Sequence, residues 1–262
     1  MGHHREIPKP EPPDLTTRSY LLYFRSGHYD RRYPNPNIST WRRMLELLPE
    51  QGHVVDFGCG NGRYLLRLKD HVGQAAGFDI NPVALEMLSA RAKELAWPEL
   101  SVLGPDPVDL GTYTETHGQA DLVLCLFGVL AHIEARSDRI IALRQMRRLL
   151  KPNEGRLLIS VPNKARRFLA EQRVAGANAA GLIRYTRDMD GTKVTLPYQL
   201  FDPARLTAEL AEAGFQIAKI RAESVLPESL LTTYAPLRWL DSLLTRMCPA
   251  SLGYGLIAVA VP

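Results

Sequence analysis

Short apolar runs and stretches of helical spacing alternate along this chain from residue 39 to its end. The runs are rich in valine, leucine and isoleucine, as expected of strands buried on both faces of a parallel sheet. Between them, apolar residues recur every three or four positions, which predicts amphipathic helices. Predicted strands cover residues 54–57, 74–79, 100–103, 121–127, 155–161, 215–220 and 255–261, and predicted helices cover 39–48, 81–92, 136–150, 202–213 and 227–247. The alternation predicts an α/β fold.

Glycines at every second position follow the first predicted strand. Asp56 lies near the end of this strand, and Gly58, Gly60 and Gly62 come next, before a further predicted helix. A strand that turns sharply into a helix beside a ligand leaves no room for a Cβ, and the turn offers free backbone N–H groups. A dinucleotide fingerprint would need its third glycine at position 63, where this chain has Arg63. A tight turn without a ligand is the alternative.

This Asp-x-Gly-x-Gly-x-Gly pattern resembles the first motif of the class I S-adenosylmethionine (SAM)-dependent methyltransferases. Residues 147–163 read Arg-x-Leu-Leu-Lys-Pro-x-x-Gly-x-Leu-x-x-Ser-Val-Pro-Asn, which is similar to a helix–turn–strand of the same family. The resemblance covers about residues 41–161 and 203–262. It implies a three-layer α/β/α sandwich with a seven-stranded, mostly parallel sheet whose last strand is antiparallel.

Two further acids follow predicted strands. Asp79 lies 21 residues after Gly58, where a carboxylate can accept hydrogen bonds from both ribose hydroxyls of a nucleoside. Asp106 stands in Gly-Pro-Asp-Pro; the resemblance implies a contact with the adenine amino group, and an ordinary loop is the alternative. The implied cofactor is SAM, with S-adenosylhomocysteine (SAH) as its product. The residues expected to contact SAM are Asp56, Gly58, Cys59, Gly60, Asp79, Ile80, Asp106 and Phe127.

The fourth predicted strand ends at Phe127-Gly-Val-Leu-Ala-His132, where the family places methyl transfer. Open parallel sheets bind ligands beyond the carboxyl ends of their strands. The Asn/Asp-Pro-Pro-aromatic sequence of many amino-group and base methyltransferases is missing, which argues against exocyclic amines of DNA bases as acceptors. His132 is the nearest candidate general base, because imidazole exchanges protons near neutral pH. Capping or packing of the following helix is the alternative.

Residues 1–38 precede the predicted methyltransferase domain, which spans residues 39–262. Residues 1–14 contain four prolines among charged residues, so we expect a tail without helix or strand. Residues 20–33 combine five aromatic side chains with three arginines. This composition predicts either a lid over the active site or a helix packed on the domain surface. Tyr29 and Tyr33 are the candidate substrate contacts in this segment.

The strand–helix rhythm breaks between residues 163 and 201. Residues 182–196 have the pattern of a hairpin that turns at Asp190-Gly191. Because it follows the fifth strand, this insertion would stand over the same end of the sheet as His132. We therefore expect a substrate cap, with Arg184, Tyr185 and Tyr198 as candidate contacts, and a surface hairpin is the alternative.

The segment 227–247 is expected to be one packing helix with a break at Pro236. Its leucine-rich surface fits a position in the core, and a lipid substrate or a second subunit are alternative partners for it.

Composition narrows the class of protein. The chain of 262 residues has a net charge of +4, a balance that fits an anionic substrate without demanding nucleic acid. Cys59, Cys125 and Cys248 are odd in number, far apart and without metal spacing, so we expect reduced thiols in the cytoplasm and no metal site. No apolar run reaches transmembrane length.

The resemblance implies an enzyme in which a substrate nucleophile displaces SAH from the methyl group of SAM. We expect a small-molecule acceptor, anionic or natural-product-like, because the cap is short and the net charge modest. Three alternatives stay open: an NAD-dependent dehydrogenase, a tRNA or RNA methyltransferase that uses the arginines of residues 25–32 and 164–187, and a non-catalytic SAM-binding protein.

Overall fold

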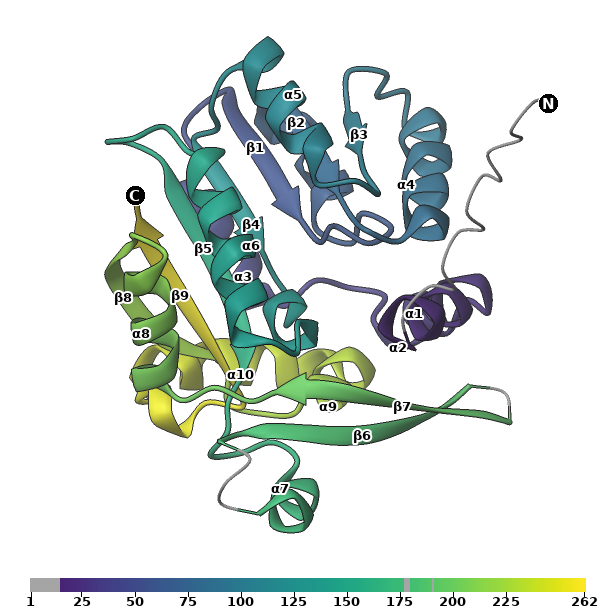
Figure 1. Cartoon of the computed structure of the whole chain (residues 1–262), viewed down its shortest axis with the longest axis vertical. Helices are drawn as coiled ribbons and strands as arrows, with labels where there is room; N and C mark the ends of the chain where they lie inside the picture. The colour runs from purple at the N-terminus through teal and green to yellow at the C-terminus, as the bar shows by residue number, and fades with distance from the viewer. Residues whose placement is uncertain (1–14, 177–179, 190) are drawn as a thin grey trace, which may run out of the picture.

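A seven-stranded sheet forms the centre of the computed structural model, which describes residues 15–176, 180–189 and 191–262. The strands lie in the order β3-β2-β1-β4-β5-β9-β8, and β9 runs antiparallel to both of its neighbours (Figure 1). They are β1 (Gly52–Phe57), β2 (Val72–Phe78), β3 (Ser101–Leu103), β4 (Leu122–Cys125), β5 (Arg156–Pro162), β8 (Gln216–Ser224) and β9 (Gly255–Val261). The predicted sheet with its antiparallel last strand is confirmed.

Helices cover both faces of this sheet, which is why its central strands are continuous apolar runs. On one face Val55 and Val123 belong to the same core cluster as α5, α6 and α8, and on the other Val54 and Leu122 pack with α3 and α4. The helices are α3 (Ile38–Leu47), α4 (Pro82–Glu94), α5 (Val108–His117), α6 (Arg136–Arg148) and α8 (Pro203–Glu212). The three-layer α/β/α sandwich is therefore confirmed.

Two helical segments differ in detail from the expectation, one in where it starts and one in its type. The first helix of the domain is capped by Asn37, whose side-chain oxygen accepts hydrogen bonds from the N–H groups of Ser39 and Thr40 at 2.8 and 3.2 Å. Asparagine is among the best N-caps, and the helix begins at Ile38, one residue before the predicted start at residue 39. The segment after the glycines is a 3₁₀-helix, η1 (Leu65–His71), which leads directly into β2. Its larger rise per residue lets seven residues span back to the sheet without a loop.

The C-terminal helical segment breaks at Tyr234 and not at Pro236. It forms α9 (Glu228–Thr233) and α10 (Ala235–Met247), and Pro236 lies in the first turn of α10. Proline is favoured there because the first N–H groups of a helix have no partner within the helix.

The insertion forms a separate hairpin of β6 (Leu182–Met189) and β7 (Thr192–Gln199), preceded by α7 (Leu169–Ala175). A backbone bridge between Asn163 and Phe201 closes its base. The N-terminal segment forms α1 (Leu15–Arg25) and α2 (His28–Arg32). Both additions lie beyond the carboxyl end of β1 (Figure 1). The predicted tail at residues 1–14 and the predicted turn residue Asp190 lie outside the described residues.

The stability of the α6–α8 layer depends on a buried ion pair. Nε and Nη2 of Arg139 each donate to a carboxylate oxygen of Glu209 at 2.8 Å, and both side chains are 1% exposed. Glu209→Leu would leave the guanidinium charge buried without its partner. We expect the free energy of unfolding, measured by urea denaturation, to fall by about 3–5 kcal/mol.

The double variant Arg139→Met/Glu209→Leu should recover most of this loss, because no buried charge remains. Arg136 and Glu212 form an exposed ion pair between the same two helices, and its removal should change stability little. Equal losses at the buried and exposed pairs would contradict the role of burial.

Candidate active site

The turn after β1 is built so that only glycine fits it. Gly58, Gly60 and Gly62 have φ angles of 83°, 53° and 88°, in the left-handed region. The N–H groups of Gly58 and Cys59 both donate to the carbonyl of Phe78, at 2.7 and 3.0 Å. A Cβ at Gly58 would lie 2.5 Å from the side chain of Val129, which follows β4. The turn is thus held tightly between the ends of β2 and β4.

The Asp79 carboxylate stands at the end of β2 and bonds to this turn. Its two oxygens accept hydrogen bonds from the N–H groups of Gly60 and Asn81, each at 2.8 Å. Burial raises the pKa of Asp79, while these backbone hydrogen bonds oppose the rise. A carboxylate oxygen can accept more than one hydrogen bond, so Asp79 keeps capacity for ribose hydroxyls.

Asp56 and Cys59 are buried. Asp56 is 4% exposed, and burial raises its pKa to about 7, with a further contribution from the charge of Asp79. The Cys59 side chain belongs to the core cluster on the α3–α4 face. Burial raises the pKa of its thiol well above the usual value. The backbone of Cys59 is therefore the part that lies in the turn.

Ile80 and Asp106 lie at the surface. Ile80 is 49% exposed. Asp106 is exposed as well, and its carboxylate accepts a hydrogen bond from the N–H of Val108 at 2.9 Å, at the start of α5. The predicted contacts of these two residues with the adenosine part of SAM remain predictions.

Arg63, noted in the sequence only as a misplaced fingerprint position, is buried beside the turn. Its Nη2 donates to Glu228 at 2.8 Å, and its Nε donates to the carbonyl of Asn35 at 3.1 Å. Its guanidinium lies 4.5 Å from the ring centroid of Phe127, at the end of β4. Its Nη1 is buried and has no hydrogen-bond partner among the described residues. An unpaired buried donor is costly, which favours an anionic group of a ligand beside it.

These residues fit SAM. The turn and Asp79 suit the ribose, as expected of a nucleoside site at the end of β2. Nη1 of Arg63 is a free donor for the carboxylate of the methionine part. Among the described residues no group of three or more His, Cys, Asp and Glu side chains could hold a metal ion.

The N-terminal segment covers the turn. The Phe24 ring would lie 3.1 Å from a Cβ at Gly60, and the Tyr33 ring centroid lies 4.6 Å from that of Phe127. Tyr29 packs edge-on against Phe127 at 6.2 Å. Asp30 ties α2 to the domain through Arg91 at 2.6 Å. The segment packs on the start of α4 and also lies over the turn, and its role as a lid stays a prediction.

His132 lies where three segments meet. Its Nε2 is 2.6 Å from the hydroxyl of Tyr20 on α1, and its ring centroid is 4.6 Å from that of Tyr198 on β7. The rings of Tyr185 and Phe168 pack on Tyr198 at 5.3 and 5.7 Å. The structure therefore brings Tyr185 and Tyr198 together with His132. Arg184 is exposed and pairs with Glu134 at 3.0 Å, at the edge of this cluster.

A hydrogen-bonded set of residues that no sequence pattern indicated supports the end of β4. Phe127 has a φ of 62°, and its N–H donates to Ser160 Oγ at 2.8 Å. Ser160 in turn hydrogen-bonds Glu223, which also accepts from Thr40 at 3.2 Å. Burial raises the pKa of Glu223 to about 7, and the nearby charge of Glu228 adds to the rise. An acid far along the chain on β8 gave no sequence signal, because only the antiparallel return of β9 brings β8 near β5.

The fold and this site define an α/β enzyme that binds a nucleoside ligand at the carboxyl end of its sheet. A family described as a methyltransferase domain matches residues 29–220. The chain belongs to this family. Its cofactor is SAM, and solved structures of the same fold include complexes with SAM and with SAH.

Two curated relatives match part of the chain. A putative methyltransferase, YqeM, of Bacillus subtilis is 29% identical over 139 residues, or 51% of this chain and 52% of that protein. A tRNA (carboxymethyluridine(34)-5-O)-methyltransferase of Arabidopsis thaliana is 30% identical over 132 residues, or 49% of this chain and 29% of that protein. The chain thus matches about half of one relative and under a third of the other.

Among solved structures, the CcbJ methyltransferase of Streptomyces caelestis has a TM-score of 0.63 with 19% identity. The match covers 95% of this chain and 99% of that one. At this identity the likeness shows the fold alone.

The ribose contact can be tested at Asp79. Asp79→Ala removes the carboxylate that we expect to accept from the ribose hydroxyls, so we expect the Kd for SAM in calorimetry to rise about 10- to 100-fold. Asp70→Ala, at an exposed acid on η1, is the matched control and should leave the Kd unchanged. An unchanged Kd in folded Asp79→Ala would remove this assignment.

The raised pKa of Glu223 predicts a pH dependence of stability. Between pH 4.5 and about 7 the folded state keeps the proton that the unfolded state loses, so this group's stabilisation declines as pH rises through that window. Glu223→Gln cannot titrate. The wild-type stability relative to this variant should therefore fall by about 3 kcal/mol across the window, as measured by urea denaturation. Glu50→Gln, at an exposed acid, should show no such difference.

Proposed function

The chain is a SAM-dependent methyltransferase, and we propose that it methylates a small molecule that carries an acidic group. One observation carries the proposal: α1, the β4 end and the hairpin converge on His132 through Tyr20 and Tyr198. Side chains from three segments therefore pack around His132, which we take as the acceptor side of the site. Such close packing favours a small acceptor over a folded polymer.

The acidic group is inferred from Arg167, in the same neighbourhood. Its guanidinium lies 5.4 and 4.9 Å from the ring centroids of Phe168 and Tyr254. Its Nε is buried without a hydrogen-bond partner among the described residues. A carboxylate or phosphate of the acceptor would satisfy this donor, since guanidinium pairs strongly with both.

The residues around the acceptor side have proposed tasks in this reaction. When bound, SAM supplies a methyl group activated by its positively charged sulfur. Arg63 would hold the carboxylate of SAM, and His132 would take the proton from the acceptor, with Tyr20 holding its ring in place. Residues 1–38 would act as the lid and 163–201 as the cap, with Tyr29, Tyr33, Arg184, Tyr185 and Tyr198 toward the substrate. We keep the cytoplasm as the proposed location, from the number and spacing of the cysteines.

A methyl-transfer assay with radiolabelled SAM tests the proposal. Small acids with hydroxyl, amine or thiol groups, their neutral esters, and tRNA would be offered as separate acceptors. We expect label in small acids and little in their esters. The Arabidopsis relative makes tRNA the competing candidate, helped by the exposed Arg25, Arg31 and Arg32. Labelling of tRNA alone, with steep salt dependence, would overturn the proposal.

The roles of His132 and Arg167 predict different kinetic effects. His132→Ala should lower kcat about 100- to 10,000-fold and leave the Kd for SAM unchanged, because it removes a base and no cofactor contact. Arg167→Met should instead raise the KM for the acidic acceptor and leave kcat similar. Loss of SAM binding in His132→Ala would show that this histidine is structural.

A further inference from the structure

Helix α10 buries polar side chains and exposes apolar ones, the reverse of an ordinary surface helix. Its buried residues are Asp241, Ser242 and Thr245, all polar. Its exposed residues include Trp239 at 68% and Met247 at 89%. The exposed apolar side chains recur at helical spacing, so they lie on one solvent-facing side of the helix. They are Trp239, Leu240, Leu243, Leu244 and Met247. We call these five residues the α10 apolar face.

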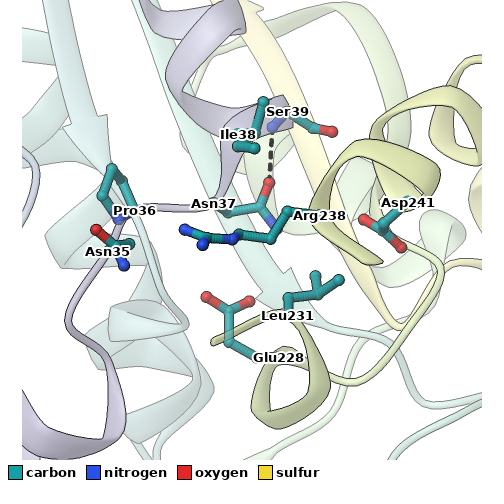
Figure 2. A pocket seen from close by; sticks show the side chains of 9 residues that line it. All are labelled: Asn35, Pro36, Asn37, Ile38, Ser39, Glu228, Leu231, Arg238 and Asp241. Atoms are coloured by element: carbon teal, nitrogen blue, oxygen red, sulfur yellow. Dashed lines mark hydrogen bonds between the residues drawn. The ribbon is translucent and has the colours of Figure 1, made fainter. Parts of the chain in front are cut away.

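Hydrogen bonds fix the helix in this orientation. One carboxylate oxygen of Asp241 accepts from the N–H groups of Val225 and Leu226, each at 2.8 Å, at the end of β8. The Thr245 hydroxyl lies 3.1 Å from that of Ser39 on α3. Figure 2 shows Arg238 and Asp241 on the side of α10 toward Asn37 and Glu228. A roll of α10 would break these contacts, so the apolar face is a fixed feature of the fold.

A cationic groove borders this face. The groove, of about 390 Å³, lies between α3, β8 and α10 and is lined by Arg42, Arg43, Arg221 and Arg246. Glu46 is the acid that lines it, and it pairs with Arg43 at 2.7 Å. Three positive charges therefore remain beside the α10 apolar face. We call this set of four arginines the arginine groove.

We propose that α10 and the arginine groove form a docking site for an anionic membrane surface. The α10 apolar face would enter the boundary between headgroups and acyl chains, as interfacial amphipathic helices do. The arginine groove would hold lipid phosphates, and Trp239 would sit at the interface, where indole is favoured. The described residues contain no helix long and apolar enough to cross a membrane, so the site binds the surface.

Charge favours a membrane over a second copy of the chain. In a two-fold dimer through this face, each copy would bring its own arginine groove to the same interface. Like charges would then meet, with few acids to offset them. An anionic bilayer offers acyl chains and phosphates together, which matches the apolar face beside the arginines.

Vesicle sedimentation of the full chain tests the site. With phosphatidylcholine vesicles containing 30% phosphatidylglycerol, we expect binding that weakens with salt and is much lower on phosphatidylcholine alone. Leu243→Glu should lower the partition coefficient at least tenfold, and Arg246→Glu about fivefold or more. Val174→Glu and Arg148→Glu, which place the same changes at exposed positions on α7 and α6, should bind like the wild type.

Tryptophan fluorescence supplies a second readout. Lipids brominated near the headgroup should quench part of the emission, and Trp239→Phe should abolish the quenching while sedimentation persists. Binding that ignores lipid charge, or that Leu243→Glu leaves intact, would overturn the proposal. So would light scattering that shows a dimer lost in Leu243→Glu, with no vesicle binding by the wild type.

Discussion

The two hydrogen bonds from Gly58 and Cys59 to the carbonyl of Phe78 are the constraint on which the site depends. They fold the chain after β1 back onto the end of β2, where Asp79 can reach the N–H of Gly60. They also place the backbone of Gly58 close to the side chain of Val129, which follows β4. Because β1 lies between β2 and β4, one turn sets the positions of Asp79 and of the loop that carries His132.

Much of this arrangement could be predicted from local patterns. The glycine spacing, the apolar runs and the acid after the second strand each reflect a backbone requirement that acts within a few residues. The hairpin was predicted for the same reason, from alternating residues on either side of a turn. The start predicted at residue 39 is one residue late, although asparagine at position 37 is itself a favoured N-cap.

The supporting groups could not be predicted, because they come from distant parts of the chain. Glu223 reaches Ser160 only through the order β5-β9-β8, and Glu228 reaches Arg63 from the helix after β8. Neither acid has a local motif. Arg63 looked like a departure from a fingerprint, yet its burial against Phe127 makes it part of the site. Burial and tertiary proximity, not spacing, give these residues their importance.

The segment from Asn35 to Ser39 connects the two surfaces that carry our proposals. Asn35 accepts from Arg63 beside the turn, and the N–H of Asn37 donates to the hydroxyl of Tyr64 at 3.1 Å. Two residues later Ser39 contacts Thr245 on α10. A membrane bound by α10 would therefore restrain the start of α3. The segment that leads from α2 into the domain would be restrained with it, because it is continuous with α3. Because α1 and α2 cover the glycine turn, docking would fix how this cover is oriented to the membrane, and would keep the site at a fixed height over the lipid surface.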